Sequence, residues 1–380
     1  MCLITPRAVR RCFKSRYHCK RDLFIVCFMI LIVILSLSVD LEQLYSFIQN
    51  HQSSLSLLLF SSFNTPIANR LLILVRTSHH CESRLKYLLK TWIPPLKRNQ
   101  QKSNIFLLTD QYIKNSSYDK FENVILTDCP QKHKIFDLCC KTADEFQLYH
   151  NLTKNGAKFD WMCRFDDDQY VNLDNLYSYL TKLNSSIPYY IGRTSKYSIK
   201  IPDNNQTVHF ATYGAGVCYS KVLLSKLQNY INKSITPDDC IKTRFADDAY
   251  LGYTIAYKLN TSLTINKQLH SHLERLQISF HRLTLENLLE AITFGFSWDR
   301  YQLKWMPVIH EIIQLSRKHQ KDQDSLMLLW NFVRDYEKTH PENITGKVDD
   351  SCTSYHKEKN VSVANMPNKA ILLTTKHIKI

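Results

Sequence analysis

Apolar runs alternate with helix-like periodic segments through the middle of the chain. Unbroken apolar runs, each typical of a buried strand, span residues 71–75, 105–108 and 124–126. After the first run, Ser83 begins a helical pattern that Pro94 stops. A second helical pattern, over about 138–154, precedes the apolar run that ends at Asp166. This alternation predicts an α/β domain with a doubly wound, mostly parallel sheet.

The longest apolar run, residues 23–39, lies near the N-terminus. It is at the short end of the length that spans a bilayer, about 17–25 residues. Residues 1–22 are strongly basic, which predicts a cytoplasmic tail. We therefore expect one signal-anchor helix, followed by a luminal stem over residues 40–66. A cleaved signal peptide is the alternative, but its apolar core is usually shorter and Ser36–Asp40 is a poor cleavage site.

The sequons, cysteines and charge of the residues after the apolar run are consistent with a luminal location. The Asn-x-Ser/Thr sequons all follow the apolar run, at Asn115, Asn151, Asn184, Asn205, Asn232, Asn260, Asn343 and Asn360. Eight cysteines also follow it, an even number that predicts disulfides in an oxidising compartment. The net charge of +15 falls to +9 without residues 1–22, from 42 basic and 33 acidic residues. Because this charge is scattered and no nucleic-acid motif accompanies it, we expect no nucleic-acid partner.

Three consecutive carboxylates, Asp166 to Asp168, end the apolar run that begins at Trp161. In open α/β sheets, ligands bind beyond the carboxyl ends of the strands. Like charges this close repel, so three ionised carboxylates favour binding of a cation. Their oxygens suit magnesium, manganese or calcium. The alternative is a solvated acidic turn before a helix that Asn172 caps.

Three further segments carry possible chemistry. Gly214 and Gly216 interrupt an apolar, strand-like run, which predicts either a bulge or close backbone approach to a ligand, or plain turns. Asp247-Asp248 opens a helical pattern, where acids either cap the helix or serve a site at its positive end. His270 and His272 share one face if their segment is extended.

Taken in this order, these segments resemble the Fringe glycosyltransferases, within the wider β1,3-glycosyltransferase family, from about Leu71 to Pro307. The motifs that carry the resemblance are Ser83–Trp92, Cys140–Phe146, Trp161–Asn172, Tyr190–Arg193, His209–Cys218, Asp247–Tyr253 and Leu269–Gln277. The last of these is closer to Fringe than to the galactosyltransferases. The resemblance implies a GT-A-like catalytic domain over residues 67–310. Residues 311–380, a C-terminal extension of unknown role, lie outside the resemblance.

The resemblance also implies a role for individual residues. Asp168 and His272 would hold a manganese ion, Arg84 and Asp167 would contact the UDP-sugar donor, and Asp248 would be the catalytic base. Two disulfides are implied as well, Cys129–Cys140 and Cys163–Cys218.

Other positions compete with the family pattern or depart from it. Asp239 lies in a Pro-Asp-Asp-Cys segment that is also similar to the family's motif. We prefer Asp248 because it precedes the Gly-Tyr helix and stands 24 residues before His272. Tyr213 replaces the first glycine of the family's Gly-Gly-Ala-Gly, which we expect to alter the floor of the sugar pocket. The family's C-terminal cysteine pair is not evident, since only Cys352 lies there.

The implied function is inverting transfer of N-acetylglucosamine from UDP-GlcNAc, in β1,3 linkage, to O-linked fucose on EGF-like repeats, as in Notch-type receptors. The implied location is the Golgi membrane, with one N-terminal anchor and a luminal catalytic domain. One alternative is a β1,3-galactosyltransferase of mucin-type glycans, which shares the fold, the metal and the base. Another is a non-catalytic Golgi binding protein or chaperone, against which the retained site residues argue.

Overall fold

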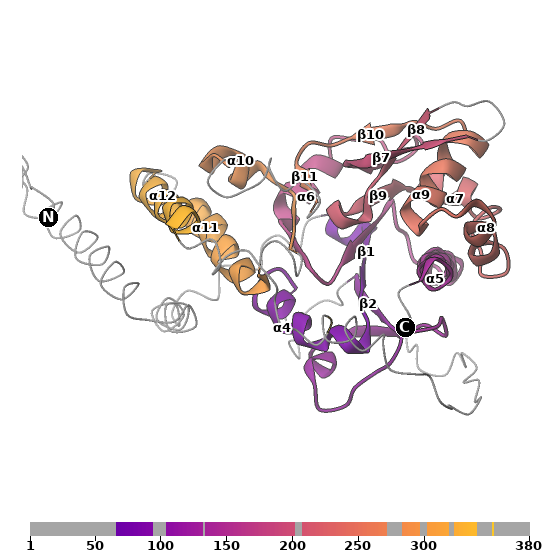
Figure 1. The fold of residues 1–380 in the computed structure, drawn as a ribbon, viewed down its shortest axis with the longest axis horizontal. Coiled ribbons are helices and arrows are strands. Elements are labelled where there is room, and N and C mark those ends of the chain that lie inside the picture. Colours follow the sequence, from indigo (N-terminus) through magenta and orange to yellow (C-terminus); the bar gives the residue numbers. More distant parts are fainter. Residues whose placement is uncertain are drawn as a thin grey trace, which may run out of the picture. The chain divides into compact units, whose positions relative to one another are not determined.

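The computed structural model describes residues 66–93, 104–131, 134–201, 207–271, 283–296, 302–318, 323–339 and 352 (Figure 1). The chain divides into two compact units, residues 1–60 and 61–380, and every described residue belongs to the second. The predicted tail 1–22 and anchor 23–39 lie outside the described residues, so the anchor stays a prediction. Within the described part, the structure contains no helix with the length and apolar character that crossing a bilayer requires.

A seven-stranded, mainly parallel sheet forms the centre of the fold, in the order β10-β6-β9-β4-β1-β2-β3. Its strands are β1 (Leu71–Arg76), β2 (Ile105–Thr109), β3 (Asn123–Leu126), β4 (Trp161–Asp166), β6 (Tyr190–Gly192), β9 (Val217–Ser220) and β10 (Leu263–Ile265). Strand β9 runs antiparallel to β4 and β6, and the other neighbouring pairs are parallel. The predicted α/β class with a mostly parallel sheet is therefore confirmed.

The burial of the strands follows their place in the sheet. Every residue of β1 is buried because this strand has neighbours on both sides and is covered on both faces. Strand β3 was expected to be buried, but it is only half-buried, and Leu126 is 47% exposed. The reason is that β3 is the edge strand, a position that the apolar run at 124–126 does not reveal.

The helices are α4 (Glu82–Lys90), α5 (Ile135–Lys154), α6 (Leu173–Leu180), α7 (Lys221–Leu227), α8 (Thr236–Thr243), α9 (Asp247–Tyr253), α10 (Leu285–Glu290), α11 (Met306–Lys318) and α12 (Gln323–Thr339). Apolar side chains of α5, α7, α8 and α9 share one core cluster with residues of the sheet, and Figure 1 shows these helices along one side of it. Asn172 caps α6, as predicted, by accepting a hydrogen bond from the backbone N–H of Asn175 at 3.3 Å. Ser83 is not the cap of α4, because a 3₁₀ turn over His79–Cys81 leads directly into Glu82.

Two smaller sheets flank the central one. One joins β11 (Leu269–His270), β12 (Thr293–Gly295) and β5 (Gln169–Val171), and the other joins β7 (Thr194–Lys200) and β8 (Thr207–Ala211). The apolar run around Gly214 is not one strand, since a 3₁₀ turn over Tyr213–Ala215 separates β8 from β9. Gly216 has φ +80°, and a Cβ there would lie 2.5 Å from the ring of Phe165. The close approach at Gly216 is thus to a core side chain and not to a ligand.

Four disulfides pair all eight cysteines that follow the predicted anchor: Cys81–Cys352, Cys129–Cys140, Cys139–Cys240 and Cys163–Cys218. The second and fourth are the pairs that the resemblance implies. Cys163 and Cys218 are directly opposite each other in the β4–β9 ladder, so the fourth disulfide ties the strand of the acidic triplet to the strand after Gly216.

Candidate functional site

Three parallel strands end side by side at one edge of the central sheet. The last residue of β1, Arg76, is in register with Asp166 on β4 and with Leu108 on β2. Because parallel strands present their carboxyl ends at a common edge, the residues that follow them converge there. The acidic triplet lies at this edge, as its position after an apolar run predicted.

The carboxylate of Asp167 is held by residues that follow β1. Thr77 Oγ1 donates a hydrogen bond to Asp167 Oδ2 at 2.6 Å. Arg84 Nη1, from α4, donates to Asp167 Oδ1 at 3.0 Å. The backbone N–H of Asp167 donates to the carbonyl of Arg76 at 3.1 Å. The two residues predicted to contact the donor, Arg84 and Asp167, are therefore in direct contact with each other.

The next carboxylate, Asp168, is less completely paired. Its Oδ2 lies 3.5 Å from Arg84 Nη1, whereas its buried Oδ1 has no hydrogen-bond partner among the described residues. Burial raises the pKa of Asp168 well above the ordinary value, and Arg84 offsets only part of this rise. A buried carboxylate oxygen without a partner is suited to a hard divalent cation, so this residue fits the predicted metal ion.

The second predicted ligand, His272, lies outside the described residues. The strand that precedes it, β11, belongs to the small sheet in which β12 pairs with β5. Strand β5 starts directly after Asp168, and the backbone N–H of Phe296 donates to the carbonyl of Asp168 at 2.7 Å. The described part of the chain thus brings β11 into the same small sheet as the strand that follows the triplet.

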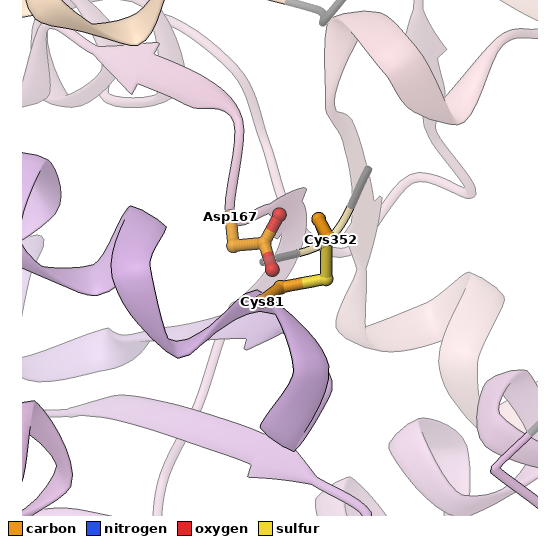
Figure 2. Close-up of side chains that lie close together, drawn as sticks. All are labelled: Cys81, Asp167 and Cys352. Carbon is orange, nitrogen blue, oxygen red and sulfur yellow. A yellow bond between two sulfur atoms is a disulfide. The ribbon is translucent and has the colours of Figure 1, made fainter. Parts of the chain in front are cut away.

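A disulfide lies beside the triplet. The sulfur atoms of Cys81 and Cys352 and a carboxylate oxygen of Asp167 all lie within 4.8 Å of one another (Figure 2). Because the two sulfurs are bonded to each other, they offer no thiolate to a metal ion. The group is therefore a structural contact, in which the disulfide covers one side of the Asp167 carboxylate.

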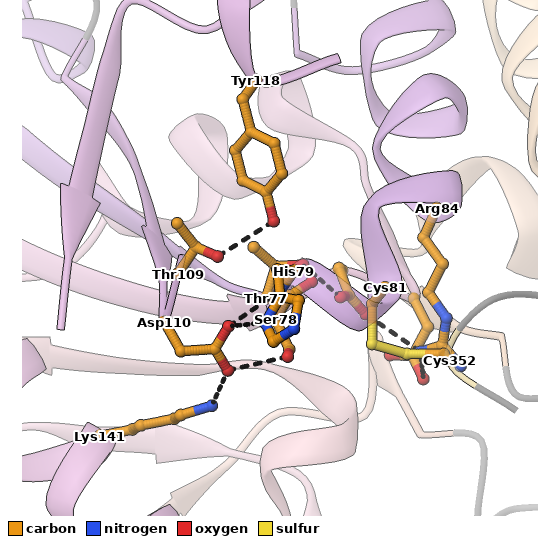
Figure 3. Close-up of a disulfide and its surroundings, with 12 residues drawn as sticks. Thr77, Ser78, His79, Cys81, Arg84, Thr109, Asp110, Tyr118, Lys141 and Cys352 are labelled. Atoms are coloured by element: carbon orange, nitrogen blue, oxygen red, sulfur yellow. Dashed lines mark hydrogen bonds and ion pairs between the residues drawn. A yellow bond between two sulfur atoms is a disulfide. The ribbon is translucent and has the colours of Figure 1, made fainter. Parts of the chain in front are cut away.

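The turn that carries Cys81 is fixed by Asp110, at the end of β2 (Figure 3). Asp110 accepts hydrogen bonds from the backbone N–H of His79 at 2.9 Å, from Ser78 Oγ at 2.8 Å and from Lys141 Nζ at 3.0 Å, and His79 Nδ1 lies 2.7 Å from it. Burial alone would raise the pKa of Asp110, but Lys141 and the bonds from His79 hold it below the ordinary value. This cluster anchors the start of α4, the helix that carries Arg84.

Asp248 opens α9 and is half-buried. Its Oδ1 accepts a hydrogen bond from the backbone N–H of Ala249 at 2.8 Å, and its Oδ2 accepts one from the backbone N–H of Tyr213 at 3.5 Å. Burial, together with the neighbouring Asp247, raises the pKa of Asp248 to about 7. A carboxylate whose pKa lies near neutrality is suited to accept a proton from a hydroxyl group.

The adjacent Asp247 has the opposite character. Arg76 Nη1 and Asp247 Oδ2 form a buried ion pair at 2.6 Å, and Thr142 Oγ1 donates to the same oxygen at 3.0 Å. Burial alone would raise the pKa of Asp247, but Arg76 and Arg164 hold it below the ordinary value. Two neighbouring carboxylates with pKa values pushed apart have different roles, one as a fixed anion and the other as a titrating group.

The competing acid, Asp239, lies on α8. It accepts a hydrogen bond from the hydroxyl of Tyr250 at 3.2 Å and pairs with Lys242 at 3.3 Å. The next residue, Cys240, is bonded to Cys139 on α5. Asp239 thus takes part in the packing of α8 against α9 and α5.

Comparison with known proteins places the chain in a family. Residues 67–339 match the family model described as Fringe-like. The chain belongs to the Fringe-like family.

Two curated relatives illustrate the match. Radical fringe of Xenopus laevis, a β-1,3-N-acetylglucosaminyltransferase by name, is 31% identical over 231 residues, which cover 58% of this chain and 63% of the relative. The Fringe glycosyltransferase of Drosophila melanogaster is 33% identical over 237 residues, which cover 60% of this chain and 54% of that protein. The chain therefore spans between half and two thirds of the length of these relatives. Among solved structures, a glycosyltransferase involved in glycosylation of the major capsid of PBCV-1 aligns at 10% identity with a TM-score of 0.32, over 60% of this chain and 94% of the other.

Within this Fringe-like chain, the ring of Tyr213 packs against Arg164. Its side chain is buried, with its ring 4.0 Å from the guanidinium carbon of Arg164, and its hydroxyl accepts a hydrogen bond from the hydroxyl of Tyr219 at 3.4 Å. The expected effect of Tyr213 on the floor of a sugar pocket stays a prediction.

Sequence reasoning missed a buried charge network below the site, formed by Arg76, Glu145 and Arg164. One signal for it was available. Arg76 ends one apolar run and Arg164 interrupts another, and arginine within a buried strand requires a charged partner.

Proposed function

We propose that this chain is an inverting, manganese-dependent β1,3-N-acetylglucosaminyltransferase that uses UDP-GlcNAc and acts on O-linked fucose of EGF-like repeats. The observation that carries the proposal is the Fringe-like match over residues 67–339, together with relatives that are named β-1,3-N-acetylglucosaminyltransferases. The placement of Arg84, Asp167, Asp168 and Asp248 supports it.

The donor is bound at the acidic triplet. Arg84 and Asp167, in contact at 3.0 Å, orient the UDP-sugar, and the Thr77 hydrogen bond fixes the carboxylate of Asp167. Asp168 and His272 would hold the manganese ion, a role supported by the Asp168 Oδ1 atom that has no hydrogen-bond partner among the described residues. When bound, this ion supplies Lewis-acid neutralisation of the charge that develops on the departing UDP.

The acceptor is activated by Asp248. Its carboxylate takes the proton of the fucose hydroxyl while that oxygen bonds to the anomeric carbon from the face opposite the UDP leaving group. The bond between the anomeric carbon and the UDP oxygen breaks in the same displacement, so the configuration inverts and no glycosyl-enzyme forms. With a pKa of about 7, Asp248 is about half ionised in neutral medium, and its ionised form is basic enough to accept the proton.

The chain acts in the Golgi membrane as a single-pass protein with its catalytic domain in the lumen. The apolar run at 23–39, the basic tail before it and the sequons that follow it support this location.

The test is a donor-by-acceptor matrix with the purified chain from residue 40 onward. UDP-GlcNAc and UDP-galactose are each offered to an O-fucosylated EGF repeat and to a mucin-type glycopeptide, with the unfucosylated EGF repeat as control. We expect transfer only from UDP-GlcNAc to the fucosylated repeat, with a β1,3 linkage in the product. Transfer of galactose to the mucin-type glycopeptide would identify a galactosyltransferase instead. Binding of either acceptor without turnover of any donor would favour a binding protein.

A further inference from the structure

We propose that Arg76 and Arg164 form a buried positioning unit that holds Asp248 in place. They act through two segments in contact with it, the start of α9 at Asp247 and the turn at Tyr213. This proposal rests on Asp248 being the base of the proposed reaction and adds residues that act through it. Neither arginine belongs to the residues that the resemblance assigns to the site.

The first segment is held by Arg76. Its Nη1 pairs with Asp247 at 2.6 Å, its Nε donates to Glu145 at 2.7 Å, and its Nη2 donates to Thr142 at 2.6 Å. The side chain of Arg76 is 7% exposed and that of Asp247 is 8% exposed. Because all three nitrogens of one planar guanidinium donate hydrogen bonds, the start of α9 is fixed relative to β1 and α5.

The second segment is held by Arg164. Its guanidinium carbon lies 4.0 Å from the centre of the Tyr213 ring, and its Nη1 donates to the carbonyl of Tyr213 at 3.5 Å. Gln169 Nε2 donates to the same carbonyl at 2.7 Å. Tyr213 is thus fixed by its ring and by its carbonyl, and its own N–H is directed at Asp248 Oδ2.

One carboxylate joins the two arginines. Glu145 Oε1 lies 2.7 Å from Arg76 Nε and 3.5 Å from Arg164 Nε, and its side chain is 1% exposed. Arg164 also pairs with Asp166 at 2.7 Å. The two buried cations are therefore balanced by the buried Glu145 and Asp247 and by the partly exposed Asp166, and neither arginine can move without leaving an anion unpaired.

Charged and titratable groups on three elements face Asp248 among the described residues. Asp247 on α9 raises the pKa of Asp248, after the larger effect of burial, whereas Arg164 on β4 lowers it. Tyr190 on β6 is the third, since Asp248 in turn raises the pKa of that phenol. The pKa of Asp248, and with it the pH dependence of kcat, thus depends on where the positioning unit holds Asp247 and Arg164 relative to Asp248.

The test compares, in the full chain, the arginine that ends β1 with the arginine that immediately precedes it. Arg70→Lys is the matched control, because Arg70 ends the 3₁₀ turn before β1, has a side chain that is 52% exposed and pairs with Asp160 at 2.7 Å. Lysine keeps the charge at either position but cannot make three planar bonds. We expect Arg76→Lys to lower kcat about 10–100-fold, the scale of a small misplacement of a catalytic group, with KM for UDP-GlcNAc unchanged. Arg70→Lys should have wild-type kcat.

Two further comparisons keep the proposal testable if Arg76→Lys folds poorly. Tyr213→Leu should lower kcat because it loses the stack on Arg164, whereas Tyr213→Phe should keep most activity. Asp247→Asn should move the acid limb of the kcat–pH profile to lower pH by about one unit, since it removes a like charge beside Asp248. A fall in folded protein alone would not move that limb.

The outcomes separate the two proposals. A wild-type kcat in Arg76→Lys would overturn the positioning unit. So would a second pair of results: a loss of activity in Tyr213→Leu that only follows the folded fraction, together with an unchanged acid limb of the kcat–pH profile in Asp247→Asn. Full activity in Asp248→Asn would instead overturn the choice of base, whatever the arginine variants do.

Discussion

Cys81 and Cys352, 271 positions apart in the sequence, form a disulfide beside the carboxylate of Asp167 (Figure 2). Cys81 is also the N-cap residue of α4, and Arg84 lies in the first turn of that helix. The disulfide therefore ties a residue near the C-terminus to the helix that holds Asp167. It has two expected consequences, one for stability and one for donor binding.

We expect the double variant Cys81→Ser/Cys352→Ser to lose about 2–5 kcal/mol of unfolding free energy, because the disulfide closes a very long loop in the unfolded chain. KM for UDP-GlcNAc should rise as the start of α4 loosens. Urea unfolding and donor kinetics measure the two effects. The matched control, Cys129→Ser/Cys140→Ser, opens a loop of only 11 positions and should lose less stability with little change in KM. Equal losses and an unchanged KM in both variants would contradict this view of the disulfide.

The proposed metal ion gives a second prediction. Manganese should raise the melting temperature of the protein, since a ligand at 100 times its Kd stabilises the folded state by about 2.7 kcal/mol. Asp168→Asn should abolish both this shift and transfer, because it removes a ligand atom. Asp174→Asn is the control, since Asp174 pairs with Arg317 on α11. Thermal unfolding with and without manganese, after treatment with a chelator, measures the shift. Full activity in chelator would refute the metal assignment.

Local signals predicted those parts of the fold whose cause is local. The apolar run at 71–75 became β1, and Asn172 caps α6 because its side chain reaches an N–H three residues later. In each case, the residues that determine the local structure lie next to one another in the sequence.

Features that depend on distant partners could not be predicted in this way. Arg76 and Asp247 are 171 positions apart, and neither position indicates that the strand end of one meets the helix start of the other. The half-exposed β3 has the same origin, since an apolar run does not tell an edge strand from a central one. The contacts of the Tyr213 ring likewise depend on Arg164, 49 positions away in the sequence.

The predicted membrane anchor at residues 23–39 is tested by replacing it with a cleavable signal peptide. A chain in which a cleavable signal peptide replaces residues 1–39 should be secreted in active form, whereas the full chain should stay with Golgi membranes. Both forms should lose mass on enzymatic removal of N-glycans, because the sequon residues Asn115 and Asn151 are exposed. Subcellular fractionation and a gel-shift assay are sufficient. Secretion of the full chain would show that residues 23–39 are cleaved or do not anchor it.

The final prediction separates the base from its competitor. Asp248→Asn keeps the shape of the side chain but cannot accept a proton, so transfer should fall by at least about 10²-fold while UDP binding stays near normal. Asp239→Asn, on α8, should change neither. In the unmodified protein, kcat should fall as the pH drops through about 7, because protonation of Asp248 removes the base. This limb should be absent from the residual activity of Asp248→Asn. Loss of transfer in Asp239→Asn with a normal Asp248→Asn would move the base to α8 and overturn the site described around Tyr213.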